Sequence, residues 1–162
     1  MYPLLFGNQI IWPVLEQLNC DSRSALSLLL TTAIMETGIN LLPSKTKKNH
    51  FGIYQLSSSM HQIAWDKELV KHPDSASAVR GLASQHNFLQ SPDSELIGNL
   101  PYATAITWFY FCNEQKNIPL SLTPKQAASL WNNKFHKGKA KSRTQLFAKH
   151  FEQYLLQKHL AA

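Results

Sequence analysis

The chain has 162 residues, of which 44% are hydrophobic and 10% aromatic, and its formal net charge is +6. This length and composition are typical of one packed globular domain, so we expect a single domain over residues 1–162. No run of about 18 apolar residues occurs, and we therefore expect no membrane span.

The N-terminal segment is apolar but lacks the features of a secretory signal peptide. No Lys or Arg precedes its apolar residues, and Gly7, Asn8 and Pro13 interrupt them. A signal peptide would show a basic start and a small-residue cleavage site. We therefore predict none.

The first predicted helix begins at an N-cap, Asp21 or Ser22, and runs to about Thr37. Gly38 follows as a stop signal. Apolar residues occur all round this helix, which is typical of a central, buried element. Residues 41–50 are expected to form a polar loop with a basic tip.

The next segment, Phe51–Leu56, is short, apolar and β-tending, and a serine-rich turn follows it. Only helices are expected beyond it, at 60–71, 74–90, a short stretch after 91–93, 102–115, 124–135 and 142–160. The sequence therefore predicts a mainly α fold with little strand.

Glu36 is an unusual residue for a buried helix. No other carboxylate lies between Asp21 and Glu36, and Glu36 shares a face with Leu29, Thr32 and Ala33. Burial and the negative end of the helix dipole should both raise its pKa. A carboxyl kept protonated near neutral pH is suited to general acid catalysis. The alternative is a glutamate that simply points into water.

Cysteines and histidines give no metal signature. Cys20 and Cys112 belong to no CxxC motif, and we expect buried free thiols, although folding could still pair them. The seven histidines form no HExxH or equivalent pattern. We expect neither a metal site nor a cofactor.

The positive charge is concentrated in the C-terminal part. From Lys125 onward the sequence contains one acid, Glu152, and eight Lys and Arg residues (125, 134, 137, 139, 141, 143, 149 and 158). Such a segment attracts polyanions, so nucleic acid, anionic lipid and an anionic cell envelope all stay open as partners. A solvated helix face that binds nothing is the alternative.

Two segments together resemble the signature of peptidoglycan-cleaving enzymes of the lysozyme superfamily. Ala33-Ile-Met-Glu-Thr-Gly followed by Gly52-Ile-Tyr-Gln-Leu is similar to soluble lytic transglycosylases and goose-type lysozymes, in which a helix ending in Glu-Ser precedes a Gly-Leu-Met-Gln-Leu/Val strand. Asn49-His-Phe-Gly-Ile also resembles the Asn-Leu-Phe-Gly-Ile of bacterial cell-wall glucosaminidases. The clear resemblance covers residues 25–62. Tyr102–Asn113 lies where the family has Ala-Tyr-Asn-Ala-Gly, but it lacks the glycine.

The resemblance implies a lysozyme-like α+β fold, a helical domain whose small β segment borders a substrate cleft. It implies a peptidoglycan-degrading glycosidase that acts on the bond between N-acetylmuramic acid and N-acetylglucosamine, with Glu36 as catalytic acid and then base. The substrate-binding residues that it implies are Thr37, Gly52, Tyr54, Gln55, Tyr102 and Tyr110.

A lytic transglycosylase is the expected form of this activity, because a paired-carboxylate glycosidase needs a second acid. No acid lies between Glu36 and Phe51, and Asp66 and Glu68 fall on a predicted helix where a solvated role is favoured. A hydrolytic muramidase or N-acetylglucosaminidase is the alternative enzyme. A non-catalytic peptidoglycan-binding component of a virion or secretion apparatus is the alternative from another class.

The expected partners are peptidoglycan glycan strands, together with phage-particle or secretion-apparatus proteins. A nucleic-acid-binding role ranks last, since no recognition motif accompanies the basic segment. We expect synthesis in the cytoplasm and action in the periplasm or cell wall, after delivery by a virion, a lysis system or a secretion machine.

Overall fold

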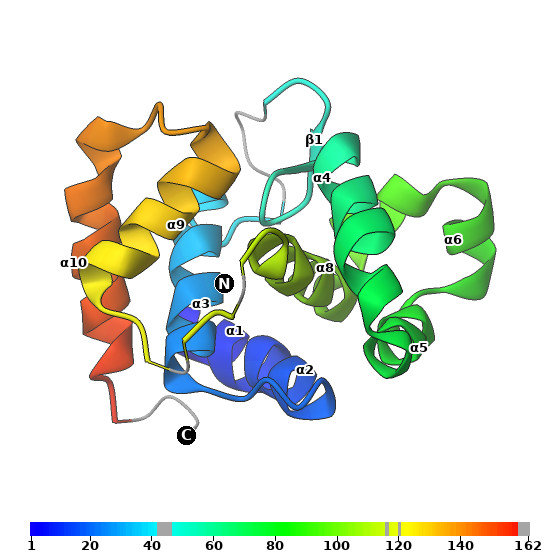
Figure 1. Ribbon diagram of the computed structural model, residues 1–162, viewed down its shortest axis with the longest axis horizontal. Coiled ribbons are helices and arrows are strands. Elements are labelled where there is room, and N and C mark those ends of the chain that lie inside the picture. The colour runs from blue at the N-terminus through cyan, green and yellow to red at the C-terminus, as the bar shows by residue number, and fades with distance from the viewer. Residues whose placement is uncertain (42–46, 116, 120, 159–162) are drawn as a thin grey trace.

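A computed structural model describes residues 1–41, 47–115, 117–119 and 121–158. Helices make up most of it, with one small antiparallel sheet (Figure 1). The predicted mainly α fold with a small β segment is confirmed. Within the described ranges, no helix is both long and apolar enough to cross a membrane.

The chain begins with a helical segment that the sequence pattern did not predict. Helix α1 (Pro3–Phe6), the π-helical turn η1 (Gly7–Ile11) and helix α2 (Trp12–Gln17) follow one another without a break. Pro13 cannot donate a helical hydrogen bond, and the wider π turn comes directly before it. Pro13 lies inside this continuous helical run, directly after the point where the π turn changes the hydrogen-bond pattern.

Helix α3 (Arg23–Thr37) is the central helix that was predicted. Ser22 is its N-cap, and the hydroxyl of Ser22 accepts a hydrogen bond of 3.0 Å from the backbone N–H of Ala25. Gly38 ends the helix in the left-handed conformation at φ 66°. Side chains on every face of α3 are buried, as the all-round apolar pattern indicated.

The segment expected as a single short strand is a hairpin. Strands β1 (His50–Phe51) and β2 (Leu56–Ser57) pair antiparallel, with His50 opposite Ser57 and Phe51 opposite Leu56. Residues 52–55 form the turn between them. Gly52 and Gln55 both have positive φ there, which an extended strand does not allow.

Helices follow the hairpin, as predicted, but the expected helix 74–90 is divided. Ala83 adopts an extended conformation and ends the first half. The elements are α4 (Ser58–Ile63), η2 (Ala64–Glu68), η3 (Leu69–Lys71), α5 (Pro73–Leu82), α6 (Gln85–Gln90), η4 (Pro92–Ser94), α7 (Glu95–Gly98) and α8 (Leu100–Cys112). Helix α8 is buried along nearly all of its length and forms the centre of the core with α3.

Two C-terminal helices pack against each other, and the second of them also packs against α3, on the side away from α5 and α6 (Figure 1). Helix α9 (Pro124–His136) begins with a capping box at Thr123, as the Thr-Pro pair predicted. The turn η5 (Lys141–Arg143) leads into α10 (Thr144–Leu155). Helix α10 ends before the predicted position 160, which lies outside the described residues.

Candidate active site

The carboxyl group of Glu36 lies where the C-terminal ends of α3 and α9 meet. Its side chain is only 1% exposed. The indole N–H of Trp131 donates to Oε1 at 3.0 Å, and Nε2 of His136 lies 2.8 Å from the same oxygen. Nζ of Lys47 lies 3.2 Å from the other oxygen, Oε2. The burial expected for Glu36 is confirmed, and three donors surround the carboxyl group.

The pKa of Glu36 is lowered, so the expectation of a raised pKa is wrong. Burial of the carboxyl group does raise its pKa, and this is the largest single effect. The hydrogen bond from His136 and the positive charge of Lys47 act in the opposite direction and together exceed it. In this arrangement Glu36 is therefore a carboxylate at neutral pH.

The Trp131 indole is fixed from several sides. Its ring stacks on Phe147 with centroids 4.8 Å apart, and His136 meets it edge-on at 4.6 Å. The guanidinium of Arg143 lies 5.3 Å from the ring centroid and also donates to the carbonyl oxygen of Met35 at 2.6 Å. These contacts fix the direction in which the indole N–H points.

The hairpin turn is attached directly to the end of α3. The hydroxyl of Thr37 donates to the carbonyl oxygen of Ile53 at 2.8 Å. The side-chain amide of Gln55 donates to the carbonyl oxygen of Gly52 at 2.8 Å, and its oxygen accepts from the backbone N–H of Lys47 at 3.2 Å. Thr37 and Gln55 thus join α3, the turn and the backbone of Lys47, whose ammonium group reaches Glu36.

Gly52 makes a close backbone contact, but with the protein itself. Its φ is +69°, and a Cβ atom added at this position would lie 1.8 Å from the carbonyl oxygen of Leu96 in α7. The resemblance implied that Gly52 binds the substrate. The structure shows instead that α7 occupies the space beside Gly52.

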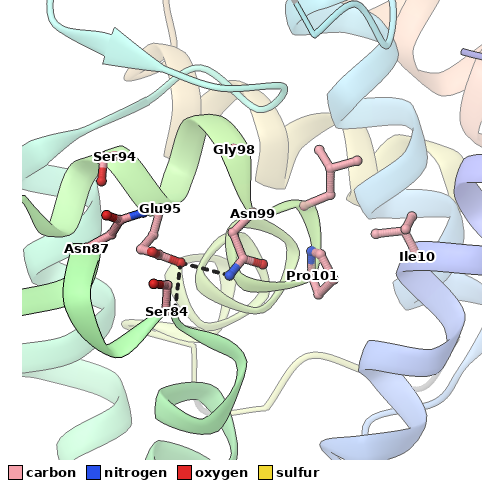
Figure 2. Close-up of a pocket in the computed structure, with 9 residues that line it drawn as sticks. Ile10, Ser84, Asn87, Ser94, Glu95, Gly98, Asn99 and Pro101 are labelled. Atoms are coloured by element: carbon pink, nitrogen blue, oxygen red, sulfur yellow. Dashed lines mark hydrogen bonds between the residues drawn. The ribbon is translucent and has the colours of Figure 1, made fainter.

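Figure 2 shows a separate pocket of about 470 Å³ beside α7, with the buried carboxylate of Glu95 among its lining residues. Oε2 of Glu95 accepts from the backbone N–H of Ser84 at 3.2 Å and from the amide of Asn99 at 2.8 Å. Asn99 also caps α8 by accepting from the N–H of Tyr102. This carboxylate therefore joins the α5–α6 loop to α8 and holds α7, which contacts Gly52.

The three tyrosines expected to bind substrate are engaged within the protein. Tyr54 and Tyr102 are fully buried. The Tyr54 hydroxyl bonds to Thr104 at 3.0 Å, and the Tyr102 hydroxyl contacts His61 at 2.7 Å. Tyr110 donates to the carbonyl oxygen of Lys134 at 2.8 Å and so supports the last turn of α9. The structure does not bring the rings of these tyrosines to the carboxyl group of Glu36.

Glu68, a candidate second carboxylate, is engaged elsewhere. Its two oxygens lie 3.3 Å from Lys71 Nζ and from His72 Nε2. His136 and Lys47, which lower the pKa of Glu36, are both basic. Among the described residues, no group of three or more His, Cys, Asp or Glu side chains is placed to hold a metal ion.

Sequence reasoning missed three partners of Glu36, namely Lys47, Trp131 and His136. The ring of Trp131 is fully buried in the core. A carboxylate on an apolar helix face requires polar partners, and this requirement was the only available signal. It does not say which of the many lysines and histidines supply them, because His136 is 100 positions away.

Comparison of the chain with protein-family models, with curated proteins and with solved structures finds no match.

Proposed function

We propose that this protein is a peptidoglycan-degrading glycosidase of lysozyme-like fold, with Glu36 as its general acid and base. The observation that carries the proposal is the Glu36 carboxyl group itself. It is 1% exposed, lies at the end of a buried helix, and has two donors on one oxygen and a partly exposed lysine on the other. Buried carboxyl groups with a perturbed pKa and a specific set of partners are common at catalytic sites.

The attachment of the hairpin turn to α3 adds support. Thr37 joins the residue after the acid to the Gly52–Leu56 segment, so the two halves of the motif are in direct contact. In the resemblance that motivates the proposal, the same two halves form the catalytic acid and the adjoining wall of a glycan site.

A single-acid reaction suits this site better than a pair of carboxylates. Glu36 gives its proton to the glycosidic oxygen as the C1–O bond breaks, and the bonding pair goes to that oxygen. The acetamido oxygen of the muramyl residue stabilises C1. The resulting carboxylate then takes a proton from the muramyl 6-hydroxyl as its oxygen adds to C1, which yields an anhydro end and restores the acid.

Product analysis distinguishes the enzymatic alternatives. The protein is incubated with purified peptidoglycan, and the released fragments are analysed by mass spectrometry. We expect anhydromuramyl ends. Reducing N-acetylmuramic acid ends would indicate a hydrolytic muramidase instead. Reducing N-acetylglucosamine ends would indicate an N-acetylglucosaminidase that cleaves the other glycosidic bond.

Glu36→Gln tests the role of the acid, because glutamine keeps the size of the side chain and an acceptor oxygen but cannot donate the proton. We expect cleavage to fall between about 10²- and 10⁴-fold, the usual contribution of a general acid. Glu68→Gln is the matched control, since Glu68 is also a buried acid with two basic partners. Binding to peptidoglycan without cleavage by the wild type would favour the non-catalytic alternative.

A further inference from the structure

We infer that Trp131 and His136 are positioning residues that hold Oε1 of Glu36, which leaves Oε2 as the oxygen that exchanges its proton with the substrate. In this arrangement, Nζ of Lys47 occupies the place of the substrate's glycosidic oxygen. The inference rests on the proposed function and specifies how its acid works.

The donors on the two carboxyl oxygens differ in kind. The Trp131 indole can only donate, and it donates to Oε1 at 3.0 Å from a ring held by Phe147, His136 and Arg143. His136 is 13% exposed and lies 2.8 Å from the same oxygen. Two donors on Oε1 saturate that oxygen, so an acidic proton has to reside on Oε2.

The partner of Oε2 is replaceable. The Lys47 side chain is 44% exposed, whereas that of Glu36 is 1% exposed. The Lys47 ammonium group is carried on a flexible four-carbon side chain, so it can move away from Oε2 without movement of the backbone. A neutral glycan can therefore displace Nζ and place its glycosidic oxygen against Oε2.

Displacement of Lys47 also changes the charge state of Glu36. Among the described residues, the basic groups near the carboxyl group are Lys47 before β1, His136 on α9 and Arg143 on η5, which is engaged with Met35 and the Trp131 ring. Without Lys47, burial acts against fewer opposing positive charges, and the neutral acid is favoured. Glu36 is therefore protonated when a bound glycan has displaced Lys47.

After proton transfer, Trp131 and His136 have a second effect. The carboxylate formed on loss of the Oε2 proton is stabilised by the two N–H donors that remain on Oε1. This stabilisation favours the step in which the proton leaves. It is also an effect on kcat rather than on substrate binding.

The inference is tested with Trp131→Phe, which keeps a buried aromatic ring and removes only the N–H donor. We expect kcat to fall by about 10-fold or more with KM nearly unchanged, since loss of one preorganised donor costs this much or more at other sites. Trp65→Phe is the matched control, because the indole of Trp65 also donates one hydrogen bond, to the Tyr102 hydroxyl at 2.9 Å. Its kcat should stay near the wild-type value, because the Trp65 hydrogen bond goes to Tyr102 and not to Glu36.

His136→Phe and His136→Gln separate donation from packing. The phenylalanine variant should lose activity as Trp131→Phe does. The glutamine variant should recover most of it, because its amide can donate to Oε1. Lys47→Met should lower KM, since no ammonium group then competes with the glycan for Oε2.

A measurement independent of catalysis completes the test. The Glu36 carboxyl carbon is followed by NMR over a pH titration of ¹³C-labelled protein, with Glu36→Gln identifying the signal. The pKa of Glu36 should rise in Lys47→Met and in Trp131→Phe and stay unchanged in Trp65→Phe. An unchanged pKa in the first two variants would overturn the inference. So would full kcat in Trp131→Phe and His136→Phe when Glu36→Gln is inactive, whereas an active Glu36→Gln would overturn the proposed function instead.

Discussion

At the scale of single residues, the protonation state of Glu36 depends on a competition between burial and donors. A carboxyl group at the end of an apolar helix would be expected to hold its proton more strongly than one in water. Here His136 and Lys47 reverse that expectation, and the pKa is lowered. The same contacts that stabilise the carboxylate make it a poor acid until one of them is withdrawn.

The lowered pKa predicts a pH dependence of stability. A carboxyl group whose pKa is lower in the folded than in the unfolded chain stabilises the fold above its ordinary pKa, which for Glu36 is 4.5. That contribution is lost as the pH falls through the lowered value. Urea unfolding between pH 7 and pH 3 should therefore show a steeper loss of stability for the wild type than for Glu36→Gln. Parallel curves for the two proteins would contradict the assigned direction of the pKa shift.

Residue-level reasoning from the sequence was correct where the information is local. The N-cap Ser22, the stop at Gly38 and the burial of Glu36 follow from the pattern of residues 21–38. The resemblance implied that Tyr54 and Tyr102 bind substrate, but both rings lie in the core. Both rings are large enough to fill core space, and both hydroxyl groups find polar partners there.

At the scale of elements, the site depends on how the end of α3, the hairpin turn and α7 contact one another. Thr37 joins α3 to the turn, and the backbone of α7 packs against Gly52. Sequence reasoning anticipated β structure here but expected one strand. The turn was not predicted because its positive φ values fall partly on Gln55, a residue that gives no turn signal.

The contact between Gly52 and α7 predicts a large difference between two glycine substitutions. Gly52 and Gly38 have nearly the same φ, +69° and +66°, but an added Cβ at Gly38 would meet nothing within 4 Å. Gly38→Ala should therefore cost only the conformational strain, about 1–2 kcal/mol. Gly52→Ala should cost more, because Leu96 must also move. Equal losses of stability in urea unfolding would show that the close contact between Gly52 and α7 does not contribute to the cost of the substitution.

At the scale of the whole molecule, the site is assembled from distant parts of the chain. The bonds from Glu36 to Trp131 and His136 span 95 and 100 positions, and α9 is positioned for them by packing with α8 and with α10, which itself packs against α3 (Figure 1). Such contacts follow from tertiary packing, which periodicity does not encode. The sequence therefore indicated the acid but not its partners.

The two cysteines provide a test of this packing. Both are free and line one pocket of about 240 Å³ beside α8, to which Glu68, His72 and Ser75 also contribute. Burial raises the pKa of both thiols, so little reactive thiolate is present at neutral pH. An aromatic disulfide reagent should react slowly with the native protein and rapidly with two thiols in urea. Absence of both thiols in urea would show instead that Cys20 and Cys112 pair.

The central claim is that Glu36 is the acid that cleaves the glycan, and the most direct test is the rate at which new glycan ends appear. Purified peptidoglycan is digested with wild type, Glu36→Gln and Glu68→Gln at matched folded concentrations. We predict that Glu68→Gln cleaves at nearly the wild-type rate and that Glu36→Gln is slower by about 10² or more. Cleavage by Glu36→Gln at the wild-type rate would contradict the claim.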